Sequence, residues 1–413
     1  MTTKSADICI IGGGIIGLAS AYFLQKEGLK VIVVDKGPIE QACSHANCGL
    51  LNSSHILPLN DLKLISKAFK MLFKKDAAFY IKPQLDPQLW SWLIKFTLHA
   101  QAAKVNQSKE GRLELLRSSY ALYEQFQQEE NMAKNVPKGY LLAFKTAQAF
   151  ENYITKNELL KRYGLEAQPL VGTELQTFEP ALRDDVFGAW YQPNSMSFKS
   201  NEVMASFRKA ILENGGEICD QEEIIHFNAK QNVSAIQSYS TRYEAKNYIL
   251  AAGSWSPLFK RWTKLHLPII PAKGYSITMK KPAITPKIPI SLREADVVAT
   301  PFENAYRLGG IMELIGYDAK IDPRRLTLLK TGATQYLKTP YTDEVYEEWC
   351  GWRPMTADGL PYIDQSPYHK NLWIATGHGM LGLSMAMGTG KLLSELLVEK
   401  ETHINAKPYA LNR

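Results

Sequence analysis

Two short apolar runs near the N-terminus are typical of buried parallel strands. The first covers residues 7–11 and leads into Gly12-Gly13-Gly14-Ile15-Ile16-Gly17, and the second covers residues 31–34 and ends on Asp35. The apolar residues between them, through Leu24, favour a buried helix. A strand, a glycine turn, a helix and a second strand ending on an acid together predict a dinucleotide-binding unit.

Each glycine of this turn has its own task in such a site. Gly12 allows the tight turn out of the strand, Gly14 lets the backbone approach a pyrophosphate, and Gly17 lets the helix pack closely on the sheet. The pyrophosphate would lie at the positive end of the helix, while Asp35 would accept hydrogen bonds from a ribose. The predicted cofactor contacts here also include Ile16 and Lys36.

The remaining pattern predicts a mixture of helices and strands. Apolar spacing favours helix between residues 60 and 131, with Leu113, Leu116, Tyr120 and Tyr123 on one buried stripe. A further helix is expected over residues 201–214. Strands are expected at residues 140–144, 190–198, from 217, 233–236, 248–251, 274–279, 307–314 and 371–376. Five prolines between residues 267 and 290 predict edge strands and loops around the strand at 274–279.

Two more of these strands end in turns of small residues. Residues 248–251 lead into Ala252-Gly253-Ser254-Trp255, and residues 371–376 lead into Gly377-His378-Gly379-Met380-Leu381-Gly382 and a helix that continues to about residue 399. Three separated turns of this kind indicate FAD as the cofactor. The dipole of the last helix would face the flavin edge where negative charge accumulates, and His378 either adds a hydrogen bond there or only caps the turn.

Size, charge and cysteine content narrow the class of protein. A chain of 413 residues predicts two domains. The balance of 48 basic against 41 acidic residues suits an anionic substrate or membrane surface, and the scattered distribution of the basic residues argues against nucleic acid. The five cysteines lack metal-site spacing and favour a reducing cytoplasm, with no metal expected. No segment approaches the roughly 20 apolar residues of a membrane span, so a soluble or peripheral protein is expected.

One segment leaves two interpretations open. Leu62, Ile65, Phe69 and Leu72 fall on one helical face, and Lys63, Lys67, Lys70 and Lys74 fall on the other. Such a helix can lie on an anionic membrane, or it can pack its apolar stripe on the protein with its lysines in water.

Several stretches spread over the chain form a recognisable set. The C-terminal ones are Gly351-Trp352-Arg353-Pro354-Met355-Thr356-Ala357-Asp358-Gly359 and Thr376-Gly377-His378-Gly379. The others are Ser44 with Ala46-Asn47 and Gly49, Pro271 through Lys273-Gly274-Tyr275-Ser276, and Arg307 through Gly309-Gly310. In this order, and over nearly the whole chain, these stretches resemble D-amino-acid dehydrogenases.

The resemblance implies a member of the D-amino-acid oxidase and glycine oxidase superfamily. Its fold would be α/β, with a discontinuous Rossmann-like FAD-binding domain and a substrate domain built on an antiparallel sheet flanked by helices. The corresponding ranges are 1–58, 186–262 and 345–413 for the FAD domain, and 59–185 and 263–344 for the substrate domain. The implied cofactor contacts, besides those named above, are Ser44, Asn47, Gly49, Ile224, Gly253, Trp255, His378, Gly379, Met380, Leu381 and Gly382.

The implied reaction is oxidation of D-amino acids or of D-proline and its hydroxylated forms. Hydride would pass from the α-carbon to flavin N5, giving a 2-oxo acid and ammonia or a cyclic imine, and the electrons would pass to a quinone or another acceptor. Because the flavin accepts the hydride, no side chain is expected as a catalytic residue. The protein would be cytoplasmic, either free or on the cytoplasmic face of the inner membrane.

Three residues are candidates for the substrate pocket. Arg353 matches the family position whose arginine holds the substrate carboxylate, and a guanidinium fork suits that ligand. Tyr275 would supply a hydroxyl to the substrate or would be a core residue, and His55 would line the pocket. His45 and Cys48 depart from the family pattern, and each is chemically able either to link a flavin covalently or only to pack.

Other functions stay open at this point. An oxidase of glycine, sarcosine or D-amino acids would pass its electrons to dioxygen instead. The first glycine turn alone also permits a NAD-dependent dehydrogenase, although the C-terminal glycine turn would then have no purpose. A flavin-binding protein without catalytic activity is a further alternative, because fold alone does not prove turnover.

Overall fold

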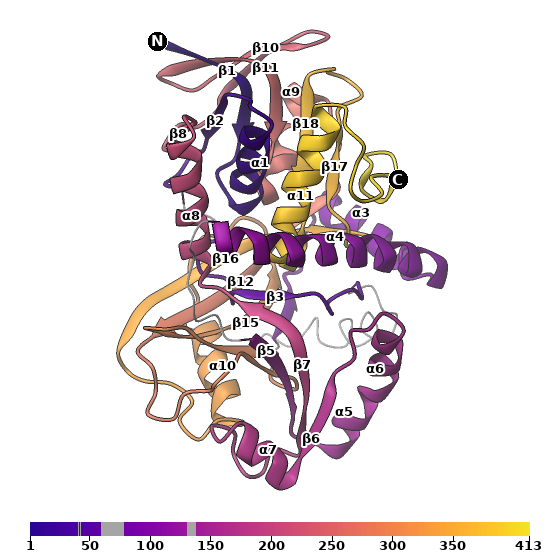
Figure 1. The fold of residues 1–413 in the computed structure, drawn as a ribbon, viewed down its shortest axis with the longest axis vertical. Helices are drawn as coiled ribbons and strands as arrows, with labels where there is room; N and C mark the ends of the chain where they lie inside the picture. Colours follow the sequence, from indigo (N-terminus) through magenta and orange to yellow (C-terminus); the bar gives the residue numbers. More distant parts are fainter. Residues whose placement is uncertain (40, 42, 59–77, 130–137) are drawn as a thin grey trace.

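The computed structural model describes residues 1–39, 41, 43–58, 78–129 and 138–413 (Figure 1). The amphipathic helix predicted over residues 62–74 lies outside these ranges. Of the helices in the described part of the chain, none combines the length and the apolar character that crossing a bilayer requires.

A first sheet is parallel at its centre. In the described residues its strands follow the order β17-β18-β11-β1-β2-β8, and β10 and β9 extend it from β11. The strands are β1 (Thr2–Ile11), β2 (Val31–Val34), β8 (Glu217–Cys219), β9 (His226–Ala229), β10 (Val233–Gln237), β11 (Thr241–Leu250), β17 (Tyr362–Gln365) and β18 (Leu372–Thr376). Ile11 is paired with both Val34 and Leu250, so three strands end together at one edge. The glycine turns that follow β1 and β11 therefore lie side by side.

Helices cover this sheet closely. They are α1 (Ile15–Lys26), α8 (Ser200–Glu213), α9 (Lys260–Thr263) and α11 (Gly382–Leu397). A β-carbon at Gly390 of α11 would lie 2.6 Å from the carbonyl oxygen of Ala19 in α1, so this glycine sets how closely the two helices cross. The helix predicted after the first glycine turn is confirmed as α1, and the helix predicted after the last glycine turn is confirmed as α11.

Helix α4 (Ala102–Glu129) crosses the molecule between the two sheets (Figure 1). Its predicted stripe is confirmed, because Leu113, Leu116 and Tyr123 are buried and Tyr120 is partly buried against the same core. The prediction of continuous helical character from residue 60 is wrong at β4 (Phe79–Ile81), which pairs with another strand. Three residues are too few for periodicity to reveal a strand.

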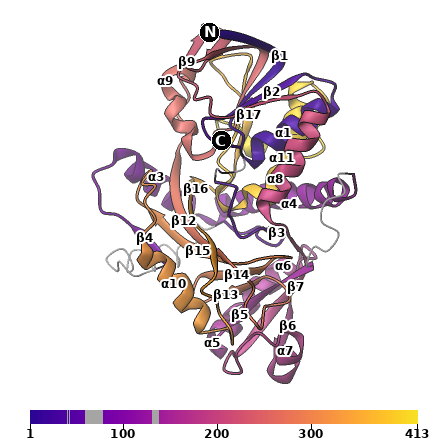
Figure 2. The ribbon, with the colours of Figure 1, turned by 90° about the vertical axis from the view of Figure 1, so that its left-hand side faces the viewer.

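A second, mostly antiparallel sheet forms the other half of the molecule (Figure 2). Its order in the described residues is β16-β12-β15-β14-β13-β5-β7-β3, with β4 beside β15 and β6 beside β7. The strands are β3 (Leu50–Asn52), β4, β5 (Lys138–Phe144), β6 (Gln168–Val171), β7 (Gly188–Ser197), β12 (Ile269–Met279), β13 (Ile290–Leu292), β14 (Val297–Pro301), β15 (Tyr306–Leu314) and β16 (Val345–Thr356).

Short helices and helical turns complete the fold. They are α3 (Pro87–Leu98), α5 (Ala147–Asn152), α6 (Ile154–Lys161), α7 (Gly172–Phe178), α10 (Pro323–Thr334), and the 3₁₀ turns η1 (Gly253–Phe259), η2 (Gly379–Leu381) and η3 (Lys407–Tyr409). With both sheets present, the α/β fold class expected from the sequence is confirmed.

The expectation of an edge strand near residue 274 is wrong. β12 pairs with β16 on one side and with β15 on the other. Its ladder with β15 starts only at Lys273, so Pro271 lies where β12 has a single neighbour, opposite Pro354. A proline is tolerated there because the missing N–H has no partner strand on the open side.

The strand pairing differs in detail from the predicted domain ranges. β3, β7 and β16 join the second sheet, although residues 1–58, 186–262 and 345–413 were assigned to the FAD domain. These strands are held by long-range ladders, such as the one between β16 and β12, which local sequence patterns do not reveal. The division into two domains itself stays a prediction.

Candidate active site

A large cavity is lined by residues of both sheets and has a volume of about 1870 Å³. It contains every residue predicted above to bind cofactor or substrate, with the exception of Gly17. These lining residues are Gly12, Gly14, Ile16, Asp35, Lys36, Ser44, Asn47, Gly49, His55, Ile224, Gly253, Trp255, Tyr275, Arg353, His378, Gly379, Met380, Leu381 and Gly382. Segments that are distant in sequence therefore share one site, but the role of each residue stays a prediction.

The first glycine turn has the geometry that a phosphate cradle requires. Gly12 has a φ of 115°, and a β-carbon there would lie 2.5 Å from the carbonyl oxygen of Ala251. A β-carbon at Gly17 would lie only 1.9 Å from the carbonyl oxygen of Gly12, so this residue keeps α1 against the sheet and lies outside the cavity. At Gly14, by contrast, the nearest atom is Ser44 Oγ at 3.7 Å, which leaves open space over the start of α1.

Asp35 stiffens this turn from the end of β2. Its carboxylate accepts hydrogen bonds from the Gly13 N–H at 2.7 Å and from the Gly37 N–H at 2.9 Å. Burial raises the pKa of Asp35, and these two hydrogen bonds oppose that shift. Beside it, the Lys36 ammonium lies 4.3 Å from the centre of the Trp255 ring, which connects the end of β2 to η1.

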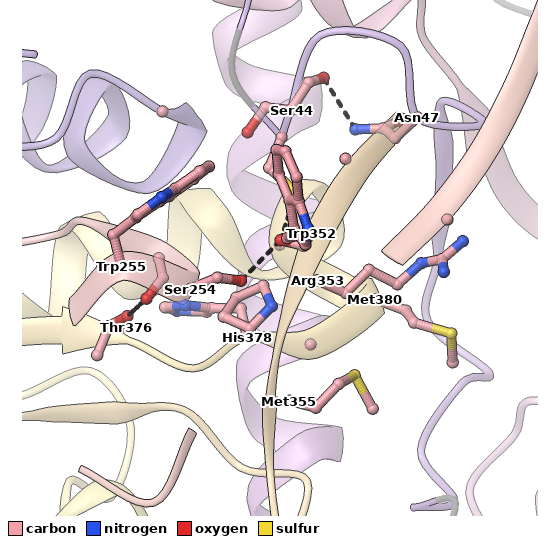
Figure 3. Close-up of a pocket in the computed structure, with 18 of the residues that line it drawn as sticks. Ser44, Asn47, Ser254, Trp255, Trp352, Arg353, Met355, Thr376, His378 and Met380 are labelled. Carbon is pink, nitrogen blue, oxygen red and sulfur yellow. Dashed lines mark hydrogen bonds between the residues drawn. The ribbon is translucent and has the colours of Figure 1, made fainter. Parts of the chain in front are cut away.

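The loop over residues 44–49 connects the two sheets at the cavity. Ser44 Oγ accepts the Ile15 N–H at 3.2 Å at the start of α1. Asn47 donates to the Ser44 carbonyl (Figure 3). Its side-chain oxygen accepts the Gly49 N–H. The buried Arg307 of β15 donates to the Asn47 carbonyl at 2.7 Å. The loop is thus held from both sides of the cavity.

The C-terminal turn presents backbone rather than a charged side chain. Gly379 has a φ of 56°, and η2 leads directly into α11. His378 is buried, and its Nε2 lies 2.9 Å from Thr389 Oγ1 within α11. Burial lowers the pKa of His378 to about 3, so its ring is neutral at physiological pH. The geometry favours a packing role for this side chain.

Arg353 brings a positive charge into the cavity from β16. Its Nη1 donates to the Ile311 carbonyl at 2.8 Å, and its guanidinium lies over Gly274, where a β-carbon would be 2.3 Å away. Figure 3 shows the Arg353 side chain together with those of Trp352 and Met355 from the same strand. Burial lowers the pKa of Arg353, but a guanidinium stays charged. Within the described residues, Arg353 forms no ion pair with a carboxylate.

Tyr275 and His55 differ in what they offer a substrate. The Tyr275 hydroxyl donates to Glu313 at 2.5 Å, and Glu313 also pairs with Arg325 at 2.7 Å. This network occupies the hydroxyl, so a substrate-binding role for it stays a prediction that the geometry does not favour. The His55 ring lines the cavity and lies 6.1 Å from the ring of Tyr140, centre to centre.

The residues considered for a covalent flavin link have protein partners. His45 Nε2 lies 2.7 Å from Glu347 Oε1. Cys48 lies against Gly309, and burial raises the pKa of its thiol. Neighbouring Cys43 Sγ lies 2.5 Å from the Trp352 carbonyl. These contacts fit the packing interpretation for both His45 and Cys48.

Sequence reasoning missed two parts of the cavity wall. Helix α3 contributes Trp92 and Phe96, which stack on one another, and the Trp92 indole donates to the Met355 carbonyl at 2.9 Å. Its start signal, Asp86 followed by Pro87, is visible in the sequence, but nothing there places the helix at the cavity. Arg293 also lines the cavity and follows no recognisable motif.

The residues present fit a flavin dinucleotide. Two backbone turns open into one cavity at helix starts, and neither helix has an acid in its first turn that would repel a phosphate. A β-carbon at Gly253 would meet no atom within 4 Å, so the third turn also leaves room. Asp35 lies at the end of β2, where the ribose of a bound dinucleotide is held in this kind of site.

The chain is similar in sequence to proteins named as D-amino acid dehydrogenases. The chain is 29% identical to a D-amino acid dehydrogenase of Paramagnetospirillum magneticum, covering 98% of each chain. It is 27% identical to a D-amino acid dehydrogenase of Helicobacter pylori, covering 97% of each.

Solved structures share the fold of this chain. Glycine oxidase from Geobacillus kaustophilus superposes with a TM-score of 0.78 at 20% identity over 99% of each chain. L-proline dehydrogenase from P. horikoshii gives 0.75 at 18% identity, covering 100% of this chain and 98% of that one. A family model described as FAD dependent oxidoreductase matches residues 7–396. Since that match covers most of its length, the chain belongs to the family of FAD-dependent oxidoreductases.

Proposed function

We propose that this enzyme oxidises D-amino acids, including cyclic ones of the D-proline type, and passes the electrons to a quinone or a similar organic acceptor. The observation that carries the proposal is the Arg353 guanidinium, which lines the cavity and has no carboxylate partner among the described residues. The proposal also draws on the names of the two relatives above, both D-amino acid dehydrogenases.

Arg353 would hold the substrate by its α-carboxylate. A guanidinium has five N–H donors in one plane, and the Ile311 and Gly310 carbonyls accept from Nη1 and Nη2. These two carbonyls fix the plane of the group, and its remaining donors are free to form a fork around a carboxylate. The substrate α-carbon is then fixed relative to the cavity wall, which is the orientation that this chemistry requires.

When bound, FAD takes up the two electrons and the hydrogen that the substrate α-carbon loses. We assign its phosphates to the Gly12–Gly14 turn and its ring to the space between the 44–49 loop and the Gly379–Gly382 turn. The N-terminus of α11 would stabilise negative charge at this place. Aromatic and aliphatic side chains that line the cavity, among them Trp352 and Met355, would keep water from the reacting carbon.

The substrate would leave as an imine. An open-chain imine is hydrolysed by water to a 2-oxo acid and ammonia, whereas a cyclic imine from D-proline is released intact. The substrate ammonium first loses a proton to water. Loss of hydride from the α-carbon of the neutral amine then leaves an iminium ion, which gives the imine by losing a second proton to water, so no side chain is required as a proton acceptor.

The test is anaerobic reduction of the bound flavin, which is measured as the loss of its absorbance at about 450 nm. Purified enzyme is mixed with the D- and L-forms of alanine, proline and hydroxyproline, and with glycine and sarcosine. Bleaching by D-forms at least about tenfold faster than by L-forms is the expected result. Bleaching by L-forms alone, or by no amine, would overturn the proposal.

The electron acceptor needs a separate measurement. The reduced enzyme is exposed either to dissolved oxygen or to a soluble quinone, and peroxide is measured in the first case. Fast reoxidation by the quinone with little peroxide is expected. Fast peroxide formation would instead identify an oxidase.

A further inference from the structure

The proposed function assigns no role to the residues of one cavity wall, among them Arg293. Resting on that function, we propose that Arg293, which lines this wall together with His55, forms a subsite for a second anionic group, so that acidic amino acids such as D-glutamate are preferred substrates.

This wall lies at β13 and β14 of the second sheet, whereas Arg353 belongs to β16, further along the strand order. Arg293 directly follows β13, and it lines the cavity together with Ser291 of β13 and Val298 of β14. Ser291 pairs with Val298, and Val298 pairs with Gly309 of β15. The next residue of β15, Gly310, is the one whose carbonyl faces Arg353. β13 and β15 are two strand spacings apart, roughly 10 Å. Two arginines that line one cavity from strands at such a separation can hold the two carboxylates of one small diacid.

The charge of Arg293 is not neutralised by its neighbours. The adjacent Glu294 accepts hydrogen bonds from the backbone N–H groups of Lys145 and Thr146 and from the hydroxyl of Tyr336. Asp296, on the same wall, takes part in an interaction of its own. In the described ranges, Arg293 itself forms no ion pair. An arginine that lines a cavity without a counter-ion favours an anionic ligand.

Lys156 adds a further positive charge near Arg293. Burial lowers the pKa of His55 to about 3, and the charges of Lys156, Arg293 and Arg112 contribute to the same shift. Burial also lowers the pKa of Lys156 to about 8, with Arg293 contributing. The Lys156 ammonium lies 5.5 Å from the centre of the Tyr153 ring. His55 is therefore neutral at physiological pH, whereas Arg293 and Lys156 bring positive charge to this region. An anionic side chain of the substrate would compensate the loss of hydration of Arg293 at the wall.

The experiment compares two substrates that differ only in charge. D-Glutamate and D-glutamine have the same length, and the ratio of their kcat/KM values reports the subsite. The wild-type enzyme is expected to prefer D-glutamate by about tenfold or more. Arg293→Met should lower this ratio by about tenfold, and Arg293→Glu should move the preference toward D-lysine. The control Arg183→Met removes an exposed arginine that pairs with Asp185, and its ratio should equal that of the wild type.

Binding without turnover provides the second measurement. Glutarate has two carboxylates and no oxidisable amine, and its dissociation constant can be compared with that of pentanoate by calorimetry. Glutarate should bind at least about tenfold more tightly, and Lys156→Met should weaken this preference even if the Arg293 variants do not fold.

The outcomes separate this inference from the proposed function. Equal kcat/KM for D-glutamate and D-glutamine, or a ratio unchanged by Arg293→Met, overturns the acidic subsite while amino-acid oxidation stands. Absence of flavin bleaching with every amino acid overturns the proposed function, and glutarate binding then reports on the subsite alone.

Discussion

The guanidinium of Arg353 occupies a space that exists only because residue 274 is glycine. Any side chain there would meet the guanidinium at 2.3 Å, and the Ile311 carbonyl fixes the group from the other side. β12 and β16 are adjacent strands, and Arg353 is paired with Ala272. This register places the Arg353 guanidinium over Gly274, so the two strands together shape the proposed carboxylate site. Gly274 entered the sequence argument only as part of a matching stretch, because a register cannot be read from one strand alone.

The Arg353→Ala variant should still bind FAD but should bind and oxidise its substrate poorly. Removing the only charged partner proposed for the α-carboxylate is expected to cost about 3 kcal/mol or more of transition-state stabilisation, which is at least about a hundredfold in kcat/KM. Steady-state kinetics with the best D-amino acid measure the change, and the flavin absorbance of the purified variant measures retention. Arg183→Ala is the matched control on an exposed arginine. An unchanged kcat/KM would refute the assignment.

His378 should make the fold sensitive to acid. Burial lowers its pKa from 6.5 to about 3, so the unfolded chain binds a proton between these values while the folded chain does not. Stability is therefore full above about pH 6.5 and decreases as the pH falls toward 3, by at most about 1.4 kcal/mol per pH unit from this group.

The measurement is the unfolding temperature across pH 4 to 8 for the wild type and His378→Gln. The variant keeps a donor for Thr389 and should lose part of the acid-dependent decrease. His226→Gln, at an exposed position, should follow the wild-type curve. Identical curves for all three proteins would contradict the expected contribution of His378.

At the scale of elements, the start of helix α1 separates two kinds of glycine. Gly17 has the Gly12 carbonyl 1.9 Å from where its β-carbon would be, so a side chain there would push α1 away from β1. Gly14 has only Ser44 Oγ at 3.7 Å, so a side chain there fits the protein itself but fills the space assigned to the pyrophosphate. The same short motif thus contains one packing position and one ligand position.

Gly17→Val and Gly14→Val should therefore fail in different ways. The Gly17 variant is expected to destabilise the apoprotein strongly, by several kcal/mol, because backbone has to move. The Gly14 variant is expected to keep the unfolding midpoint of the apoprotein while losing FAD. Denaturant unfolding of flavin-free protein and flavin titration distinguish the two. A yellow Gly14→Val protein would count against the phosphate assignment.

At the scale of the whole molecule, residues of both sheets line one cavity, so a single ligand would contact both sheets. The 44–49 loop bonds to α1 through Ser44 and to β15 through Arg307, and a cofactor in the cavity would contact the ends of β1, β2, β11 and β18 together. Folding of both halves is therefore expected to be coupled to cofactor binding.

Added FAD should raise the unfolding temperature of the apoprotein. A ligand at a hundred times its dissociation constant contributes about 2.7 kcal/mol to the stability of the folded state. A thermal-shift titration with FAD measures this effect, and NAD serves as the control ligand. An equal shift with NAD would argue against a cavity adapted to FAD. The absence of a shift with both nucleotides would argue against it as well.

The local sequence determined the parts of this protein whose causes are local. A strand followed by Gly12 to Gly17 and a second strand ending on Asp35 specify a dinucleotide turn, because the whole motif lies in one strand–turn–helix unit. The conflict that Gly17 avoids, with the Gly12 carbonyl, lies within the same turn. The buried stripe of α4 and the helix after Gly382 follow from periodicity in the same way.

Only the tertiary structure decided what depends on distant partners. The interior position of β12, the membership of β16 in the second sheet and the engagement of the Tyr275 hydroxyl by Glu313 all depend on pairing between segments far apart in sequence. The placement of Arg293 and Arg353 in the lining of one cavity has the same origin. Such pairings are fixed by hydrogen-bond ladders and close packing across the folded chain, and these interactions leave no periodic signal in either segment by itself.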